Sequence, residues 1–293
     1  MFEGLKERAE LWRAVYANAA NNYDVEEVSG SLIALIGAGS VGSFAGLALA
    51  KMGFSLYVVD FDHVEPHNLV NQFHDCREVA ARHYKAQALC NALVEHSLLR
   101  RDRTAPNEPL AIPQNVPWRD EDVPFDATRH PGYNEDDYLF HRVYNPVKRA
   151  KRGVVAQKAH DYVAGHGFKR CIYVFATDSM TSRRVLFDDA FRREEPPNAL
   201  IDARIGMNAV QMRYASAVDA GAYERYWKTE LYADEDAEAI PCNQQASPAI
   251  AMIAGALIAN YALRHVQRVR TQNEIHTPPP FMQFNLDALS VVR

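Results

Sequence analysis

The stretch that decides the fold runs from residue 32 to residue 42 and reads Leu32-Ile33-Ala34-Leu35-Ile36-Gly37-Ala38-Gly39-Ser40-Val41-Gly42. Its uninterrupted apolar run predicts a parallel strand covered by helices on both faces, because a strand with one face in water alternates instead. A helix is predicted to follow the glycines and to end at Gly53, and a second strand over 56–59 leads to Asp60. A strand, a glycine turn, a helix, a strand and an acid about 20 residues on together predict an adenine-nucleotide fold.

Each glycine has a physical reason to be there. Gly37 allows a sharp turn, Gly39 allows backbone N–H groups to approach a phosphate, and Gly42 allows the helix to pack close to the strand. The helix N-terminus adds a partial positive charge toward an anion. Asp60 can accept hydrogen bonds from ribose hydroxyls.

Composition places the chain among ordinary globular proteins. The 293 residues are 48% hydrophobic and 24% charged, which fits one elaborated domain over residues 1–293. The net charge of −5 gives no global reason to expect a nucleic-acid partner. The cysteines form no C-x-x-C pair, so we expect reduced thiols in a cytoplasmic protein and neither a disulfide framework nor a cysteine-only zinc site. They are Cys76, Cys90, Cys171 and Cys242.

Two segments bear on targeting. Residues 1–30 lack the apolar core of a signal peptide, and the apolar spacing from Leu5 to about Ala20 predicts an amphipathic N-terminal helical arm. The longest apolar run, 246–262, is interrupted by polar residues and is shorter than the roughly 20 residues of a membrane span. We therefore expect a soluble protein with a buried helix there and no membrane partner.

Polar residues beyond Asp60 separate two classes of nucleotide protein. A dinucleotide dehydrogenase has little polar chemistry after its ribose acid, whereas this chain continues through Asp62, Asn68, Gln72 and Lys85. Together with the glycine turn, these positions resemble the ThiF/MoeB/HesA family, the bacterial relatives of ubiquitin-activating enzymes. That pattern is D-x-D, then N-L-x-R-Q, then G-x-x-K, and later T-D-N after a strand. The stretch 170–183, which contains Thr177-Asp178-Ser179, resembles the family's later strand and its T-D-N ending, and this puts Asp178 at the T-D-N aspartate.

The resemblance implies an α/β fold: a Rossmann-like, doubly wound, mostly parallel sheet with an antiparallel C-terminal portion. It implies ATP and Mg²⁺ as cofactors and no zinc, since the structural zinc of the family uses two C-x-x-C pairs. The attack of a carboxylate on the α-phosphorus of ATP requires neutralised phosphates rather than a general base. The implied nucleotide-binding residues are Gly37, Gly39, Ser40, Gly42, Asp60, Asp62, Asn68, Gln72 and Lys85, with Asp178 as the metal ligand and Lys85 and Asp178 as catalytic residues.

The chain departs from the family pattern at the phosphate-binding arginine. Asn71 stands where N-L-x-R-Q has arginine, and the glycine of G-x-x-K is also missing. The sequence does not distinguish among Arg77, Arg82 and Arg204 as replacements. Without any replacement, the protein would bind a nucleotide without adenylating an acceptor.

Two further catalytic roles come from the resemblance. In the family, an arginine of the N-terminal helix reaches into the partner subunit's site, a role open to Arg13 or Arg8 in an expected homodimer. Cys242 precedes a small-residue helix, where some members form a thioester or persulfide; the alternative is a packing residue at a helix start. Cys90 and Cys171 are expected to be packing residues, whereas the role of Cys76 is open.

The histidines and the middle of the chain say less about function than the motifs above. His63, His67, His74 and His83 show no ligand spacing on a helix, so we expect no metal site there. Residues 100–167 form an insertion that is atypical of the family and is a lid, a recognition surface or a surface loop.

The C-terminal half is expected to complete the sheet. A helix is predicted from Arg184 to about Arg193, with strands over 199–203, 210–216 and 281–286. Residues 223–232, with the acidic run 234–238, resemble the family's crossover loop, which covers the acceptor's C-terminal tail.

The resemblance implies an ATP-dependent adenylyltransferase that activates the C-terminal carboxylate of a small ubiquitin-like or sulfur-carrier protein, with Cys242 as a candidate acyl acceptor. The alternatives are adenylation of a small-molecule, peptide or tRNA-linked carboxylate, and a non-catalytic nucleotide-binding protein.

Overall fold

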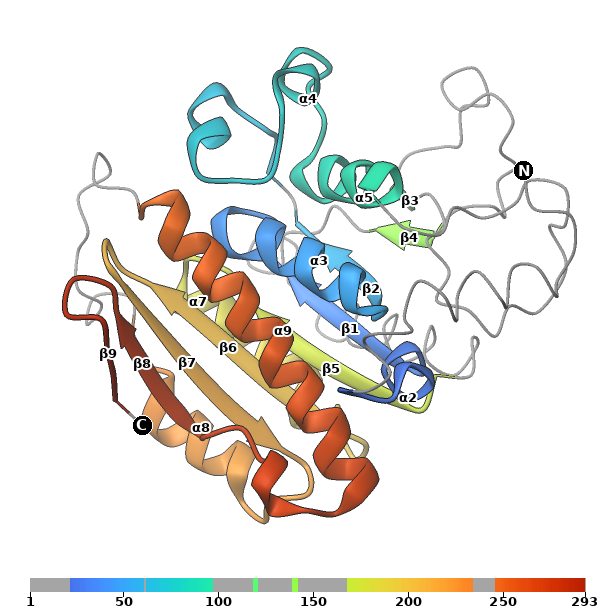
Figure 1. Cartoon of the computed structure of the whole chain (residues 1–293), viewed down its shortest axis with the longest axis vertical. Coiled ribbons are helices and arrows are strands. Elements are labelled where there is room, and N and C mark those ends of the chain that lie inside the picture. Colours follow the sequence, from blue (N-terminus) through green and yellow to red (C-terminus); the bar gives the residue numbers. More distant parts are fainter. Residues whose placement is uncertain are drawn as a thin grey trace, which may run out of the picture.

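The computed structural model describes residues 22–60, 62–96, 118–120, 139–141, 168–233 and 246–292. Its centre is a seven-stranded sheet with the strand order β2-β1-β5-β6-β7-β8-β9 (Figure 1). The strands are β1 (Ser31–Ile36), β2 (Ser55–Val59), β5 (Arg170–Phe175), β6 (Ala199–Ile205), β7 (Ala209–Ser216), β8 (Phe281–Asn285) and β9 (Ser290–Val292). The helices are α2 (Val25–Ser29), α3 (Ser40–Met52), α4 (Cys76–Ala80), α5 (Lys85–His96), α7 (Met180–Phe191), α8 (Ala222–Glu230) and α9 (Pro248–Thr271), with short 3-10 turns η2 (Pro66–Val70) and η5 (Glu274–His276).

The sheet has a parallel half and an antiparallel half. β1 pairs in parallel with β2 and β5, and β5 pairs in parallel with β6. From β6 onward the pairs β6–β7, β7–β8 and β8–β9 are antiparallel. The predicted doubly wound fold with an antiparallel C-terminal portion is therefore confirmed. β1 lies between the second strand and the strand that follows the insertion, so the chain reverses its winding at the carboxyl end of β1, where open α/β sheets bind ligands.

Both faces of the parallel half are covered. Ile33 and Leu35 belong to the core under α3, α5 and α9, whereas Leu32 and Ala34 belong to the core under α7 and α8. Figure 1 shows α3 and α9 on one side of the sheet and α7 on the other. All of β1 is buried, which explains why its sequence is uniformly apolar.

The apolar helix α9 is a core helix. Its length and composition also suit a membrane span, with a window of mean hydropathy 1.4, but 56% of that window is buried inside the protein. It packs against α3 at Gly255, where a Cβ atom would lie 2.8 Å from the backbone nitrogen of Ala45. The predicted buried helix is thus observed, and it extends beyond its predicted end.

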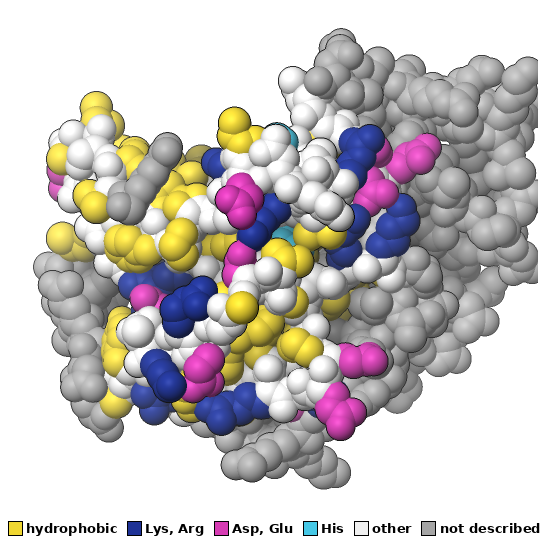
Figure 2. Space-filling model, turned by 90° about the horizontal axis from the view of Figure 1, so that it is seen from below, with side chains coloured by type: hydrophobic (Ala, Val, Ile, Leu, Met, Phe, Trp, Pro, Cys, Tyr) yellow, Lys and Arg dark blue, Asp and Glu magenta, His cyan; other side chains and the backbone are white. Residues whose placement is uncertain are grey.

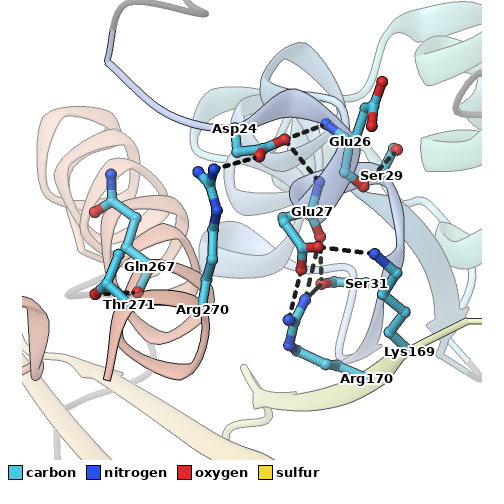
Figure 3. Close-up of polar contacts among 10 residues, drawn as sticks. All are labelled: Asp24, Glu26, Glu27, Ser29, Ser31, Lys169, Arg170, Gln267, Arg270 and Thr271. Atoms are coloured by element: carbon cyan, nitrogen blue, oxygen red, sulfur yellow. Dashed lines mark hydrogen bonds and ion pairs between the residues drawn. The ribbon is translucent and has the colours of Figure 1, made fainter. Parts of the chain in front are cut away.

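The short helix α2 ties two parts of the chain to the amino edge of the sheet (Figure 3). Asp24 caps α2 by accepting from the N–H groups of Glu26 and Glu27, and it pairs with Arg270 of α9 at 3.0 Å. Glu27 pairs with Lys169 at 2.7 Å and Arg170 at 2.6 Å. Hydrogen bonds from these two cations hold the pKa of Glu27 below its ordinary value.

Two sequence expectations for the C-terminal half need correction: a predicted helix is present but starts earlier, and most of a segment expected to be a loop is helical. The helix expected from Arg184 begins at Met180, because the Ser179 side chain caps it by accepting from the N–H of Ser182. Most of the segment expected to be a crossover loop, 223–232, is helix α8. The ring of Tyr226 is buried and stacks on Phe187 with centroids 5.4 Å apart, and this aromatic packing stabilises a helix instead of a loop.

Two short strands of the insertion are described. β3 (Trp118–Asp120) and β4 (Leu139–His141) pair in parallel and lie beside α5, and β4 also lies beside β2. The predicted N-terminal arm falls on residues outside the described part except for 22–30. The three alternatives for the insertion remain open.

Candidate functional site

The glycine turn is sterically locked between β1 and β5. Gly37 has a φ of 101°, and its N–H donates to the carbonyl oxygen of Val59 at 2.8 Å. A Cβ atom on Gly37 would lie 2.5 Å from the carbonyl oxygen of Ala176, and one on Gly42 would lie 1.8 Å from that of Gly37. The turn and the close helix packing expected for these two glycines are therefore observed.

Gly39 differs from its neighbours because it has open space. A Cβ atom there would meet only Gln72 Nε2, at 3.9 Å. Gly39 is the N-cap of α3 and supplies no side-chain cap, so it leaves the first N–H groups of the helix to another acceptor. Ser40 donates its hydroxyl to the carbonyl oxygen of Asn71 at 2.9 Å and so holds the loop after η2 against α3. This geometry suits a phosphate at the helix N-terminus.

Asp60 joins the end of β2 to the glycine turn. Its carboxylate accepts from the N–H of Ala38 at 2.6 Å and from the N–H of Asp62 at 2.9 Å. Burial raises the pKa of Asp60, and the nearby charge of Lys85 offsets part of that effect. The predicted ribose acid is thus held at the carboxyl edge of the sheet.

Lys85 is the first residue of α5, and Asp62 contacts both its backbone N–H and its side-chain ammonium group. Its N–H donates to the carbonyl oxygen of Asp62 at 2.7 Å, and its Nζ pairs with the Asp62 carboxylate at 3.1 Å. The Lys85 side chain is only 12% exposed. The structure therefore brings Lys85, Asp60 and the glycine turn together, as the sequence predicted, and gives Asp62 the added role of positioning the lysine.

Asn68 orders the loop that follows β2. It is buried, and its side-chain oxygen accepts from the N–H of Glu65 at 2.9 Å in a capping box. Its carbonyl oxygen accepts from the N–H groups of Asn71 and Gln72, which folds these two residues back toward α3. Asn71 is itself buried, so the position of the missing arginine lies inside this loop.

The proposed replacement cations lie in different surroundings. Arg77 is exposed, and its Nε and Nη2 both donate to Oδ2 of Asp75, at 2.8 and 2.6 Å. Arg82 is exposed and has a left-handed backbone with φ 55°. Arg204 lies on β6 and pairs with Asp202. The choice among the three stays open at the phosphate position.

Asp178 lies just beyond β5, next to the glycine turn. The backbone nitrogen of Thr177, its neighbour, lies 3.1 Å from the position of a Cβ on Gly37. Asp178 is exposed and makes no hydrogen bond or ion pair with the described residues. The described part of the chain has no group of three or more His, Cys, Asp or Glu side chains that would hold a metal by themselves. Mg²⁺ bound together with substrate phosphates needs only one or two carboxylates, so Asp178 fits that role.

Three buried polar atoms around the turn have no hydrogen-bond partner: Gln72 Oε1, His74 Nδ1 and Thr177 Oγ1. The other ring nitrogen of His74, Nε2, donates to the carbonyl oxygen of Ala38 at 3.1 Å. Burial lowers the pKa of His74 to about 4, so the ring is neutral at pH 7. Buried polar atoms are normally paired, so these three indicate a place for a polar ligand. No sequence pattern places His74 at the site, because only the fold brings it to the turn.

The remaining predicted residues divide into two groups. Cys242, Arg13 and Arg8 lie outside the described residues. Cys76 is an exposed free thiol. Burial raises the pKa of Cys90 and raises that of Cys171 to about 12, which fits their expected packing roles.

Residues 13–100 match the family model described as the ThiF family. This segment belongs to the ThiF family. E. coli MccB solved with MccA-N7isoASN is 13% identical, with a TM-score of 0.58 over 99% of this chain and 79% of the MccB chain. PaaA is also 13% identical, with a TM-score of 0.54 over 100% of this chain and 84% of its own. E. coli MccB with ATP is 11% identical, with a TM-score of 0.55 over 95% and 70% of the two chains. No curated protein sequence matches the chain.

The family match bears out the predicted family for residues 13–100, and the structural likenesses confirm the predicted fold. The chain has the fold of the ThiF-type ATP-dependent adenylyltransferases, and MccB of that fold has been solved with ATP. ATP is therefore supported as the nucleotide, and the alternative of an NAD-dependent dehydrogenase stays disfavoured. The acceptor, Mg²⁺ and the dimer stay predictions.

The distribution of charged side chains on the surface is relevant to nucleic-acid binding. On the face shown in Figure 2, the described Lys and Arg side chains lie among Asp and Glu side chains and hydrophobic ones, rather than in one continuous basic surface. Nucleic acids are usually bound by a basic patch or stripe. The expected absence of a nucleic-acid partner stays a prediction.

Proposed function

We propose that the protein is an ATP-dependent adenylyltransferase that activates the C-terminal carboxylate of a small ubiquitin-like or sulfur-carrier protein. The observation that carries the proposal is the convergence of the glycine turn, Asp60, Lys85 and Asp178 at one sheet edge, with unpartnered buried polar atoms around the turn. That constellation suits a nucleoside triphosphate better than a dinucleotide, because it adds the cation of Lys85 and the carboxylate of Asp178 to the ribose acid Asp60.

Each residue has a defined task in the proposed reaction. The N–H groups at the start of α3 receive phosphate oxygens in the space above Gly39. Lys85 neutralises phosphate charge, for which its Nζ must move from Asp62 to the phosphates. The acceptor carboxylate, already ionised at neutral pH, attacks the α-phosphorus, and pyrophosphate leaves with the electron pair of the broken P–O bond.

A magnesium ion would be held by Asp178 together with the phosphates. When bound, it supplies electrostatic stabilisation to the leaving pyrophosphate. The carboxylate of Asp178 is exposed and pairs with none of the described residues, which is consistent with this role. We further propose a homodimer, in which Arg13 completes the partner's site. In a later step the Cys242 thiolate attacks the acyl carbon of the adenylate, the C–O bond to the phosphate breaks, and AMP leaves.

A second acceptor class is favoured by the structural comparisons. The similar structures include MccB, described as a microcin C7 biosynthetic enzyme, in complex with N-formylated MccA. A peptide with a free C-terminal carboxylate is therefore the alternative acceptor. The same activation chemistry applies to both classes, and only the surface that recognises the acceptor differs.

Exchange of labelled pyrophosphate into ATP tests the function. The assay includes a Gly-Gly-ended carrier protein, the same carrier with its terminal carboxylate amidated, and a library of short peptides. We expect exchange with the free carrier and none with the amidated one; exchange with peptides alone would assign the second acceptor class. Absence of exchange under every condition, while ATP still binds, would contradict adenylation and leave a nucleotide-binding protein.

A further inference from the structure

A cluster of charged side chains lies on the face of β6 and β7 that α8 covers. Leu200 and Ala215 on this face belong to the core under α7 and α8. The strand alternation then places Asp202 and Arg204 on the same face as Leu200, and Arg213 pairs in register with Asp202. We call the following residues the arginine cluster: Arg183, Asp202, Arg204, Arg213, Tyr226 and Glu230.

Asp202 is the centre of the arginine cluster. Its side chain is fully buried, and Oδ1 accepts from Nε of Arg183 at 2.9 Å. Oδ2 accepts from Nε of Arg204 at 2.8 Å and from the hydroxyl of Tyr226 at 2.9 Å. Burial alone would raise the pKa of Asp202, but the two guanidinium groups hold it below its ordinary value. Asp202 is therefore an ionised carboxylate that already has its partners.

The cations of the cluster are not fully paired. Arg213 pairs through Nε with Glu230, and Arg204 donates from Nη2 to the carbonyl oxygen of Glu230 at 2.9 Å. Among the residues that the structure describes, three guanidinium groups thus face two carboxylates, which leaves one positive charge in excess. The Nη1 atoms of Arg204 and Arg213 are both buried and have no hydrogen-bond partner, and each side chain is 10% exposed. Buried charged donors without an acceptor are costly, so this arrangement calls for an anion.

The cluster adjoins the sheet edge that carries the candidate nucleotide site. Phe175 at the end of β5 pairs in register with Asp202. Asp178 follows Phe175 by three residues and Arg204 follows Asp202 by two, so both lie beyond that pair at the carboxyl edge. Arg183 comes from the first turns of α7, which begins directly after the segment of Asp178. The excess positive charge is therefore beside the place where the proposed reaction occurs.

We propose that the Nη1 groups of Arg204 and Arg213 form a subsite for a carboxylate of the acceptor chain. The proposal rests on the proposed function and names what recognises the acceptor there. A guanidinium fork matches a carboxylate in shape, and one carboxylate balances the single excess charge. The rings of Tyr232 and Phe281 lie 5.5 and 5.2 Å from the two guanidinium carbons and hold the planes in place. The carboxylate is either the terminal one or an acidic side chain near it.

Titration with small carboxylates tests the subsite in the full-length protein. The probes are N-acetyl-Gly-Gly, its C-terminal amide, the 1-amide of N-acetyl-glutamate and inorganic phosphate, and the readout is the arginine Nε–Hε resonances of ¹⁵N-labelled protein. We expect N-acetyl-Gly-Gly, and not its amide, to shift the Arg204 and Arg213 signals. A shift by the glutamate 1-amide in its place would assign an acidic side chain as the source. Arg204→Gln should weaken carboxylate binding about tenfold, the loss of one charge-assisted hydrogen bond.

Matched variants separate the subsite from a purely structural salt-bridge network. Arg225→Gln makes the same chemical change on the exposed side of α8 and should bind as wild type does. Arg213→Lys keeps the charge but loses the fork, and it replaces Arg204→Gln if that variant does not fold. Equal binding by wild type and a folded cluster variant, equal binding of acid and amide, shifts with phosphate only, or no shift with any probe would each overturn the proposal.

The same data distinguish this proposal from the proposed function. Carboxylate binding that depends on Arg204, without pyrophosphate exchange for any acceptor, would remove the adenylation function and leave the subsite. Exchange with a carrier that is unchanged in a folded Arg204→Gln protein would remove the subsite and leave the function.

Discussion

The glycine turn and the arginine cluster lie at the same edge of one sheet, yet they are built in opposite ways. The turn is built mainly of backbone, with a spacing enforced by missing Cβ atoms, as at Gly42 where 1.8 Å would separate a Cβ from the carbonyl oxygen of Gly37. The arginine cluster is built of long side chains from four separate elements around one buried carboxylate. A backbone site suits a ligand that never changes, such as a triphosphate, whereas a side-chain site is easily altered to suit a particular acceptor.

The largest expected effect is at the backbone site. Gly42→Ala should destabilise the protein by about 4 kcal/mol or more, because the added methyl group overlaps the backbone of Gly37. Gly39→Ala is the matched control, since its methyl group meets only Gln72 Nε2, at 3.9 Å. Urea unfolding should show near-wild-type stability for Gly39→Ala, whereas titration with ATP should show weaker binding. Equal stability of the two variants would mean that the turn is not locked by packing.

The arginine cluster should respond to loss of its central charge. Asp202→Asn is expected to lower the free energy of unfolding by about 3 kcal/mol, because the two buried guanidinium groups of Arg183 and Arg204 lose their shared carboxylate. Asp188→Asn is the control, since Asp188 pairs with Arg192 at the surface, where both side chains are about half exposed. A change below about 1 kcal/mol for Asp202→Asn would contradict the described pairing.

Lys85 should affect catalysis more than folding. Lys85→Met is expected to reduce pyrophosphate exchange about 100-fold, the loss of one preorganised charge at the phosphates. Lys228→Met is the control, because Lys228 is exposed and pairs with Glu224 one turn away on α8. A Lys85→Met enzyme with wild-type exchange would show that another cation serves the phosphates.

The smallest effect is expected far from both sites, at α2. Glu27 has a pKa held below its ordinary value in the folded protein by Lys169 and Arg170. Its stabilisation is therefore fully present above the unfolded pKa of about 4.5 and is lost as the pH falls through the lower folded pKa. Glu27→Gln should cost about 1 kcal/mol at pH 7 and nothing near pH 2, as measured by urea unfolding at each pH. A constant difference across this range would mean that the charge of Glu27 is not what stabilises α2.

The two regions also differ in how far the sequence could predict them. The glycine turn, Asp60, Asn68, Gln72 and Lys85 fall within about 50 residues, and their spacing follows from strand and helix periodicity. The segment of helix α8 was expected to be a loop. Its helical structure could not be predicted from the local sequence, because it is stabilised by Tyr226 packing on Phe187, a residue of another helix. The pairing of Arg183, Arg204 and Arg213 with two carboxylates likewise depends on strand register and helix placement. His74 joined the site only because the loop folds back onto Ala38.

The most direct test of the adenylation chemistry follows the oxygen atom of the acceptor carboxylate. A Gly-Gly-ended carrier labelled with ¹⁸O in its terminal carboxylate is incubated with the protein and MgATP, and the adenylate is cleaved with hydroxylamine. Attack of the carboxylate on the α-phosphorus leaves one carboxylate oxygen on the phosphate, so the AMP released should carry one ¹⁸O atom, as read by mass spectrometry. AMP without label, or ADP and phosphate in its place, would contradict adenylation of the carrier.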